Sequence, residues 1–140
     1  MRPVRWGLIG TGEISRNFAA DLTSATGSRR LAVASRSASR GAAFAAECAV
    51  ERAYASVDAL LDDPDVDVVH IGTPHGTHRA LALRALGAGK PIVVEKPIGL
   101  NRAEVEEISD AAASAGLFAM EAMWMKFKPE LPKGACTGAG

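Results

Sequence analysis

The sequence has 140 residues, of which 48% are hydrophobic, 23% charged and 5% aromatic. This length leaves no room for two ordinary domains, and the composition is typical of a soluble globular domain and disfavours a disordered chain. Sixteen basic residues balance sixteen acidic ones, so we expect a small-molecule ligand rather than a nucleic acid or an anionic membrane as partner.

Hydrophobic periodicity predicts short buried strands that alternate with amphipathic helices. In chain order, strands are expected at residues 4–9, 31–34, 52–54, 66–71, 91–94 and 117–120, and helices at about 14–26, 37–48, 56–61, 77–86 and 101–115. Asn101 and Glu104 form a capping-box pattern for the last helix, and Gly87 and Gly116 are expected helix ends. Parallel neighbours need a helical crossover, so the alternation predicts an α/β fold with a doubly wound parallel sheet of about six strands and helices on both faces.

The two cysteines bear on the cellular compartment. Cys48 and Cys136 are too few and too far apart for a disulfide framework, which favours a reducing cytoplasm. No segment approaches the roughly 18 apolar residues of a membrane span, and no apolar leader precedes the first strand pattern. We therefore expect a cytoplasmic protein that is neither exported nor inserted into a membrane.

A glycine-rich turn joins the first predicted strand to the first helix, in the run Gly10-Thr11-Gly12-Glu13-Ile14. Gly10 permits a tight turn, and Gly12 lets the backbone approach a pyrophosphate that faces the helix amino terminus. Ser15 stands where a third glycine or alanine is usual, and it is small enough for close helix packing. The alternative, a glycine turn without a ligand, is disfavoured by the surrounding βαβ pattern.

The end of the second strand distinguishes between NAD and NADP. Folds that prefer NAD place a carboxylate there to hold the ribose 2′-hydroxyl. This chain has Ser35 and Arg36 instead, with Arg40 one turn along the next helix. A guanidinium suits a 2′-phosphate, so NADP is favoured and NAD stays possible. If Arg36 and Arg40 are ordinary surface charges, dual specificity follows.

A loop of threonine, proline and histidine follows the fourth strand. Thr73, Pro74, His75 and His78 can line the groove of a cofactor or a substrate at the carboxyl edge of the sheet. The two histidines at this spacing suggest a metal, but no third ligand of matching spacing is evident, and we expect no metal site. His70, within the strand pattern, is expected to be a core histidine with satisfied hydrogen bonds.

Glu95-Lys96-Pro97 ends the fifth strand and places a lysine at the same edge. A secondary alcohol gives up hydride readily only if its hydroxyl proton is accepted, and a ketone accepts hydride only if its oxygen is protonated or polarised. Lys96 could do either, with Glu95 orienting it and Pro97 fixing the backbone direction. An ordinary surface lysine at a strand end is the alternative.

These motifs, in this order and spacing, resemble the glucose-fructose oxidoreductase and inositol dehydrogenase (Gfo/Idh/MocA) family over residues 4 to about 128. The segment from Met120 to Phe127 resembles the branch that holds dimeric dihydrodiol dehydrogenases and NADP-dependent D-xylose dehydrogenases, which commonly has arginine in place of Lys126. The resemblance implies an amino-terminal Rossmann domain and a second α/β domain that forms the substrate pocket and the oligomer interface. It also implies that Lys96 is catalytic, that Trp124 lies near the nicotinamide, and that the substrate is a sugar or a diol.

We accordingly assign residues 1–122 to the cofactor domain, and residues 123–140 to the truncated start of the substrate domain or an irregular tail. Residues 131–140 match none of the further Asp and His catalytic residues that the resemblance implies for the second domain. With the second domain absent, we expect little or no turnover from this chain alone, because substrate orientation would come from that domain.

Three alternatives stay open. A non-catalytic or interaction module that binds a dinucleotide to control a partner would carry the same glycine turn. A methyltransferase-type Rossmann domain is disfavoured, because that class uses an acidic residue where this chain has Ser35-Arg36. An unstable truncated remnant would expose the apolar sheet face that a second domain normally covers.

Overall fold

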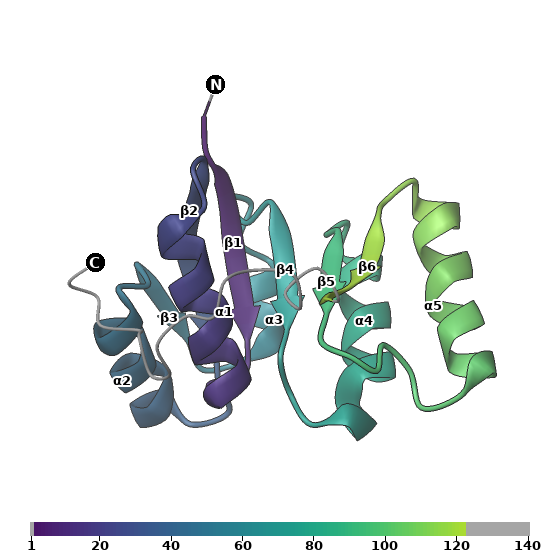
Figure 1. Cartoon of the computed structure of the whole chain (residues 1–140), viewed down its shortest axis with the longest axis horizontal. Helices are drawn as coiled ribbons and strands as arrows, with labels where there is room; N and C mark the ends of the chain where they lie inside the picture. The colour runs from purple at the N-terminus through teal and green to yellow at the C-terminus, as the bar shows by residue number, and fades with distance from the viewer. Residues whose placement is uncertain (1, 123–140) are drawn as a thin grey trace.

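The computed structural model describes residues 2–122, which form one parallel sheet flanked by helices (Figure 1). The elements follow one another as β1 Val4–Ile9, α1 Glu13–Ser24, β2 Ser28–Ala34, α2 Ala38–Cys48, β3 Arg52–Tyr54, α3 Val57–Leu61, β4 Val68–Ile71, the 3-10 turn η1 His75–Thr77, α4 His78–Gly87, β5 Ile92–Val94, α5 Arg102–Ala115 and β6 Ala119–Glu121. None of the helices in this part of the chain is long and apolar enough to cross a membrane.

The six strands lie in the order β3-β2-β1-β4-β5-β6, and every pair is parallel. This order confirms the predicted doubly wound α/β fold. The chain leaves β1 toward β2 on one side and later returns to β4 on the other side, so the topological switch point lies between β1 and β4. Ligands of such sheets bind outside the carboxyl ends of the strands at this point.

Two apolar layers hold the helices to the sheet, because successive side chains of each strand point to opposite faces. On one face, Leu8 of β1 and Val33 of β2 pack with Phe18 of α1 and Phe44 of α2. On the other face, α3, α4 and α5 pack against the alternate positions of the strands, such as Ile71. The prediction of helices on both faces is therefore confirmed.

The boundaries of two strands differ from the predicted ones. β2 begins at Ser28, before the apolar run, because its polar start pairs with the beginning of β1. β4 begins only at Val68, since the backbone N–H of Val66 donates to the carbonyl of Asp63 and so keeps Val66 in the preceding turn. In both cases backbone pairing, which apolar periodicity does not report, decides the boundary.

The last strand and the fourth helix also differ. β6 spans Ala119–Glu121 rather than residues 117–120, because Leu117 still donates to Ala112 at the end of α5. α4 begins at His78, and Gly87 is its last residue. The glycine with a positive φ at this helix end is Gly89, with a φ of 80°. The caps of α5 are as predicted, with Asn101 accepting from Glu104 N–H and the helix ending before Gly116.

The amino edge of the sheet is held by buried polar contacts. The Nζ of Lys90 donates to the backbone carbonyls of Asp63 at 2.9 Å and Val66 at 2.8 Å. The Asp63 carboxylate accepts from Arg52 and from the Tyr54 hydroxyl, both at 2.7 Å. These contacts fix the turn before β4 at the edge opposite to the carboxyl ends of the strands.

Candidate functional site

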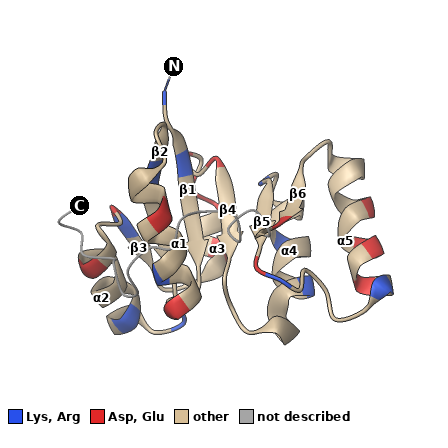
Figure 2. Cartoon of the chain, viewed as in Figure 1, with Lys and Arg blue, Asp and Glu red and all other residues tan. Residues whose placement is uncertain are grey.

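Three loops meet at the carboxyl edge, because backbone hydrogen bonds extend the strand pairing past the strand ends. Gly10 donates to Ala34, Gly72 donates to Ile9, and Glu95 donates to Ile71, at 3.0 to 3.1 Å. The glycine turn, the threonine-proline loop and the Glu-Lys-Pro segment therefore lie beside one another, as the sequence predicted. Charged side chains of both signs are distributed over the molecule (Figure 2).

The glycine turn has two distinct glycines. Gly10 has a φ of 109°, and a Cβ on it would lie 3.0 Å from the carbonyl oxygen of Gly72. Gly12 has an ordinary φ of −82° and precedes α1 without a side-chain cap. A Cβ on Gly12 would meet no other atom of residues 2–122 within 4 Å. The start of a 12-residue helix thus faces open space at Gly12, which fits an anionic group that approaches its backbone N–H groups.

Thr11, Glu13 and Ile14 complete this turn. Glu13 and Ile14 are exposed in the first turn of α1, and Thr11 is half-buried. Ser15 is fully buried, and a Cβ on Gly72 would lie 2.6 Å from its Oγ. The expectation that Ser15 permits close packing of the helix is confirmed.

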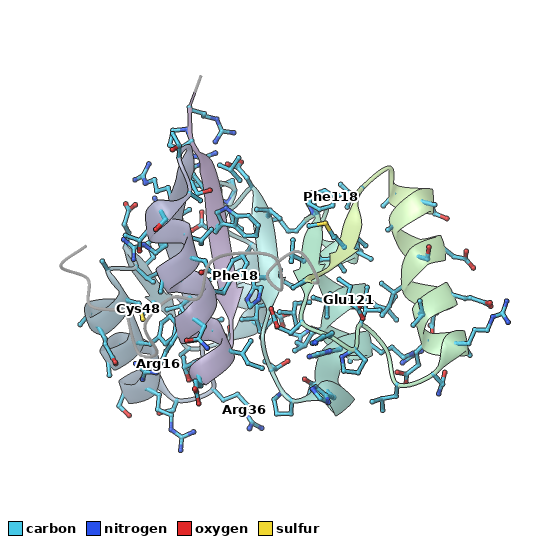
Figure 3. All side chains as sticks on the ribbon, in the orientation of Figure 1. Arg16, Phe18, Arg36, Cys48, Phe118 and Glu121 are labelled. Atoms are coloured by element: carbon cyan, nitrogen blue, oxygen red, sulfur yellow. The ribbon has the colours of Figure 1, made fainter. Side chains whose placement is uncertain are left out.

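Ser35, Arg36 and Arg40 lie at the end of β2 and the start of α2. The Ser35 hydroxyl accepts from Ser37 N–H at 3.2 Å, and Ser37 in turn caps α2 by accepting from Arg40 N–H. Both arginines are exposed, and Figure 3 shows Arg36 projecting from the carboxyl edge of the sheet. Neither guanidinium has a hydrogen bond or an ion pair with another side chain in the described range 2–122.

Threonine hydroxyls stiffen the loop that follows β4. The Thr77 hydroxyl lies 2.6 Å from the Thr73 hydroxyl and donates to the carbonyl of Pro74 at 2.6 Å. Thr77 N–H donates to the same carbonyl, which folds His75–Thr77 into a 3-10 turn. Pro74 and His75 are exposed at the edge.

His78 joins two of the site loops. Its imidazole is fully buried, with Nε2 2.9 Å from the Thr73 carbonyl and Nδ1 2.8 Å from the Pro97 carbonyl. Carbonyl oxygens only accept, so the ring donates to at least one of them. His78 therefore braces the loop after β4 against the loop after β5, and a direct contact of His78 with a cofactor stays a prediction.

Glu95 is bonded to a residue that sequence reasoning treated as part of the core. His70 Nε2 lies 3.0 Å from the Glu95 carboxylate, and the ring of His70 is fully buried. The prediction that the hydrogen bonds of His70 are satisfied is wrong for one of its two nitrogens, because Nδ1 has no partner among residues 2–122. Burial lowers the pKa of the His70 imidazole, and the hydrogen bond to Glu95 opposes that effect only in part. The ring is thus neutral near pH 7.

Lys96 is exposed at the carboxyl edge, and the peptide bond that joins it to Pro97 is cis. Two residues further along the chain, Ile98 N–H donates to the Glu121 carboxylate at 2.9 Å, which holds the loop to the end of β6. Sequence reasoning missed Glu121 as a support of this loop. Its signal was its position directly after the sixth strand pattern, at the edge where the other site residues gather.

Two further sequence predictions concern Trp124 and a metal site. Trp124 lies outside the described residues, so its position near the nicotinamide stays a prediction. Within residues 2–122, no group of three His, Cys, Asp or Glu side chains is arranged to hold a metal ion. His75 and His78 do approach each other, with ring centroids 5.7 Å apart, but both nitrogens of His78 already face backbone carbonyls.

The sequence matches the model of the Gfo/Idh/MocA oxidoreductase family, described as having an NAD-binding Rossmann fold, over residues 4–123. The chain belongs to this family. This membership confirms the family resemblance of the motifs, and it makes residues 4–123 an NAD(P)-binding Rossmann domain of an oxidoreductase family.

Its relatives include trans-1,2-dihydrobenzene-1,2-diol dehydrogenases. The proteins of Bos taurus and Homo sapiens are 44% and 43% identical to this chain over 128 residues, which are 90% of the chain and 38% of each relative. The chain therefore spans about two fifths of the length of these relatives.

Solved structures show the same fold. A 3-ketoreductase from Actinomadura kijaniata in complex with NADP superposes with a TM-score of 0.83 and 32% identity, over 91% of this chain and 41% of that one. A scyllo-inositol dehydrogenase from Lactobacillus casei gives a TM-score of 0.80 and 25% identity, over 91% of this chain and 38% of that one. Like the dihydrodiol dehydrogenases, both extend well beyond the part that this chain matches.

Proposed function

We propose that this chain is the cofactor-binding part of an NADP-dependent oxidoreductase that transfers hydride between the nicotinamide and a hydroxyl-bearing carbon of a sugar or a diol. The observation that carries the proposal is that the glycine turn and the Thr73 loop flank the switch point between β1 and β4, while the segment that contains Lys96 lies beside the Thr73 loop at the same edge. The names of the relatives support the substrate class, since they include diol and inositol dehydrogenases. The cytoplasm is the proposed compartment.

The cofactor would bind along the carboxyl edge. The backbone from Gly10 to Ile14 would hold the pyrophosphate at the start of α1, where open space at Gly12 admits it. The loop that contains Thr73, Pro74 and His75 would line the other side of the groove, held in place by His78.

Arg36, Arg40 and Ser35 would hold the 2′-phosphate of NADP. A guanidinium fork matches phosphate geometry and keeps its charge at any working pH. The exposed arginine side chains and the absence of a carboxylate at the end of β2 support this preference. The 3-ketoreductase that superposes on this chain was solved with NADP, which agrees with it.

Lys96 would move the proton that accompanies hydride transfer. When bound, the nicotinamide supplies the hydride acceptor or donor. In alcohol oxidation the Lys96 Nζ accepts the hydroxyl proton as the carbon loses hydride and the C–O bond becomes a carbonyl; in reduction the same nitrogen returns the proton to the oxygen. Glu95, the preceding residue in the chain, would orient it.

Fluorescence titration with NADPH and NADH tests the cofactor preference. We expect the wild-type chain to bind NADPH more tightly than NADH. Arg36→Ala should weaken NADPH binding by about tenfold or more, the equivalent of a lost charge-assisted hydrogen bond, and should leave NADH binding nearly unchanged.

Arg102→Ala is the matched control, because Arg102 is highly exposed on α5 and pairs with Glu106, one turn along the same helix. It should leave both affinities unchanged. Equal affinity of the wild type for NADPH and NADH would refute the role proposed for Arg36.

A further inference from the structure

The peptide unit that joins Pro97 to Ile98 follows Lys96 directly and is contacted by side chains from two other elements. Its N–H donates to the carboxylate of Glu121, the last residue of β6, at 2.9 Å. Its carbonyl oxygen lies 2.8 Å from Nδ1 of His78, the first residue of α4. Both ends of one peptide plane are therefore held by residues that are distant in the sequence.

Strand register explains why Glu121 reaches this peptide. Glu121 pairs with Val94, the last residue of β5, so both side chains point to the same face of the sheet, at the carboxyl ends of β5 and β6 (Figure 3). Val94 belongs to the apolar cluster on this face, and the side chain of Ile98 packs against the same cluster. The chain that leaves β5 therefore returns beside Glu121, which brings the Ile98 N–H to the carboxylate.

The backbone of Lys96 lies between two anchored positions. Before it, Glu95 N–H donates to the carbonyl of Ile71 on β4 at 3.0 Å. After it, the ring of Pro97 restricts the backbone, and the next peptide unit is bonded to Glu121. The segment is thus fixed to β4 on one side of the lysine and to β6 on the other side.

Strand order decides which half of a dinucleotide this segment can meet. Arg36 follows β2 and Lys96 follows β5, with β1 and β4 between these two strands. A dinucleotide whose 2′-phosphate lies at Arg36 must cross the switch point before its other half comes to Lys96. The nicotinamide half therefore depends on where the Lys96 segment lies, whereas the adenosine half does not.

We propose that Glu121 is a positioning residue, which through the Ile98 N–H holds the Lys96 segment where the nicotinamide half of the dinucleotide binds. This role deepens the proposed function and rests on it for the identity and the direction of the ligand. Glu121 itself touches neither cofactor nor substrate. Its task requires an acceptor oxygen rather than a negative charge, so a glutamine amide in its place would serve as well.

Isothermal titration calorimetry of the full chain with two ligands tests this role. NADPH has both halves, whereas adenosine 2′,5′-bisphosphate carries the 2′-phosphate and lacks the nicotinamide; the wild type should bind both. Glu121→Leu removes the acceptor and should weaken NADPH binding by about fivefold or more, with the affinity for the bisphosphate within about twofold of the wild type. Glu121→Gln keeps a side-chain carbonyl and should restore the affinity for NADPH.

Hydrogen exchange and a surface variant provide the controls. In the chain without ligand, the Ile98 amide should exchange about tenfold or more faster in Glu121→Leu and at the wild-type rate in Glu121→Gln. The Val69 amide, which donates to the carbonyl of Pro91 within the sheet, reports an intact fold and should stay protected. Glu106→Leu makes the same substitution on the exposed side of α5 and should change neither affinity. If Glu121→Leu exposes Val69, Glu121→Ala replaces it under the same criteria.

Three results would overturn the role of Glu121: unchanged NADPH affinity in Glu121→Leu, an equal loss of affinity for both ligands, or a Glu121→Gln variant that behaves like Glu121→Leu. A wild type that binds neither ligand would refute the proposed function, and the role of Glu121 with it. If the wild type binds both ligands and only the variants fail to follow the expected pattern, the proposed function stands and the role of Glu121 alone is refuted.

Discussion

At the scale of single residues, His70 couples protonation to the stability of the fold. Burial lowers the pKa of its imidazole below the ordinary value of about 6.5, and Glu95 compensates only in part. The unfolded chain therefore takes up a proton on this histidine at a higher pH than the folded chain does. The contribution of neutral His70 to stability is complete above about pH 6.5 and is lost progressively as the pH falls below it.

Removing this histidine should flatten the acid side of the stability profile. Between pH 6.5 and 5.5 we expect the free energy of unfolding of the wild type to fall more steeply than that of His70→Phe, by up to about 1.4 kcal/mol per pH unit. Urea unfolding at a series of pH values measures both slopes. His75→Phe removes an exposed histidine instead and should keep the steeper slope of the wild type; equal slopes for the wild type and His70→Phe would show that His70 is not held neutral.

The link between His70 and Glu95 also marks the limit of sequence reasoning at this scale. Local signals sufficed for Asn101 as a cap and for Ser15 as a small packing residue, because both act on their immediate neighbours. The contact of His70 with Glu95 depends on the register of β4 against β5, and the support of Ile98 by Glu121 depends on β6 lying beside β5. Neither register is encoded in a local pattern.

At the scale of elements, the turn between β1 and α1 contains two glycines with different roles. Gly10 is required by its backbone conformation and close neighbours, whereas Gly12 has free space where a Cβ would lie among the described residues. Gly12→Ala should change the free energy of unfolding by less than about 1 kcal/mol, since its φ of −82° suits alanine and no atom of the described segment lies within 4 Å of the new Cβ. The added methyl group nevertheless occupies the approach to the helix start. We expect NADPH affinity to fall by about tenfold or more, measured by fluorescence titration.

Gly10→Ala is the matched comparison at the other end of the turn. It should lower the free energy of unfolding by about 1 to 3 kcal/mol, because φ is 109° and the new Cβ would lie 3.0 Å from the Gly72 carbonyl oxygen. Chemical denaturation measures this loss. If Gly12→Ala retained full NADPH affinity, the start of α1 would not be the pyrophosphate site.

Element order was predictable from the sequence, whereas exact element ends were not. Apolar runs and turn residues predicted each strand and helix, because burial on a sheet face requires that pattern. The 3-10 turn before α4 was missed because it depends on the pairing of Thr77 with the Pro74 carbonyl. The start of β2 was missed because its first residues are polar and are held by pairing with β1.

At the scale of the whole molecule, the two edges of the sheet differ in function. At the amino edge Lys90 stabilises the turn before β4 by donating to two backbone carbonyls, and the carboxyl edge contains the candidate site. Lys90→Met removes the Nζ donor from both carbonyls, although the Asp63 carbonyl keeps the N–H of Val66, and should lower the free energy of unfolding by roughly 1 to 3 kcal/mol. At a temperature where the variant stays folded, its NADPH affinity should remain within about twofold of the wild type; a large loss of affinity would mean that the edges are not independent.

Binding of a nicotinamide dinucleotide along the carboxyl edge beside Lys96 can be followed by chemical-shift mapping of the 15N-labelled chain during NADPH titration. We expect saturable shifts at the amides of Gly10, Gly12, Arg36 and Lys96, with Asp67 and Lys90 at the amino edge unmoved. Shifts confined to the amino edge, or no saturable shifts at all, would contradict it.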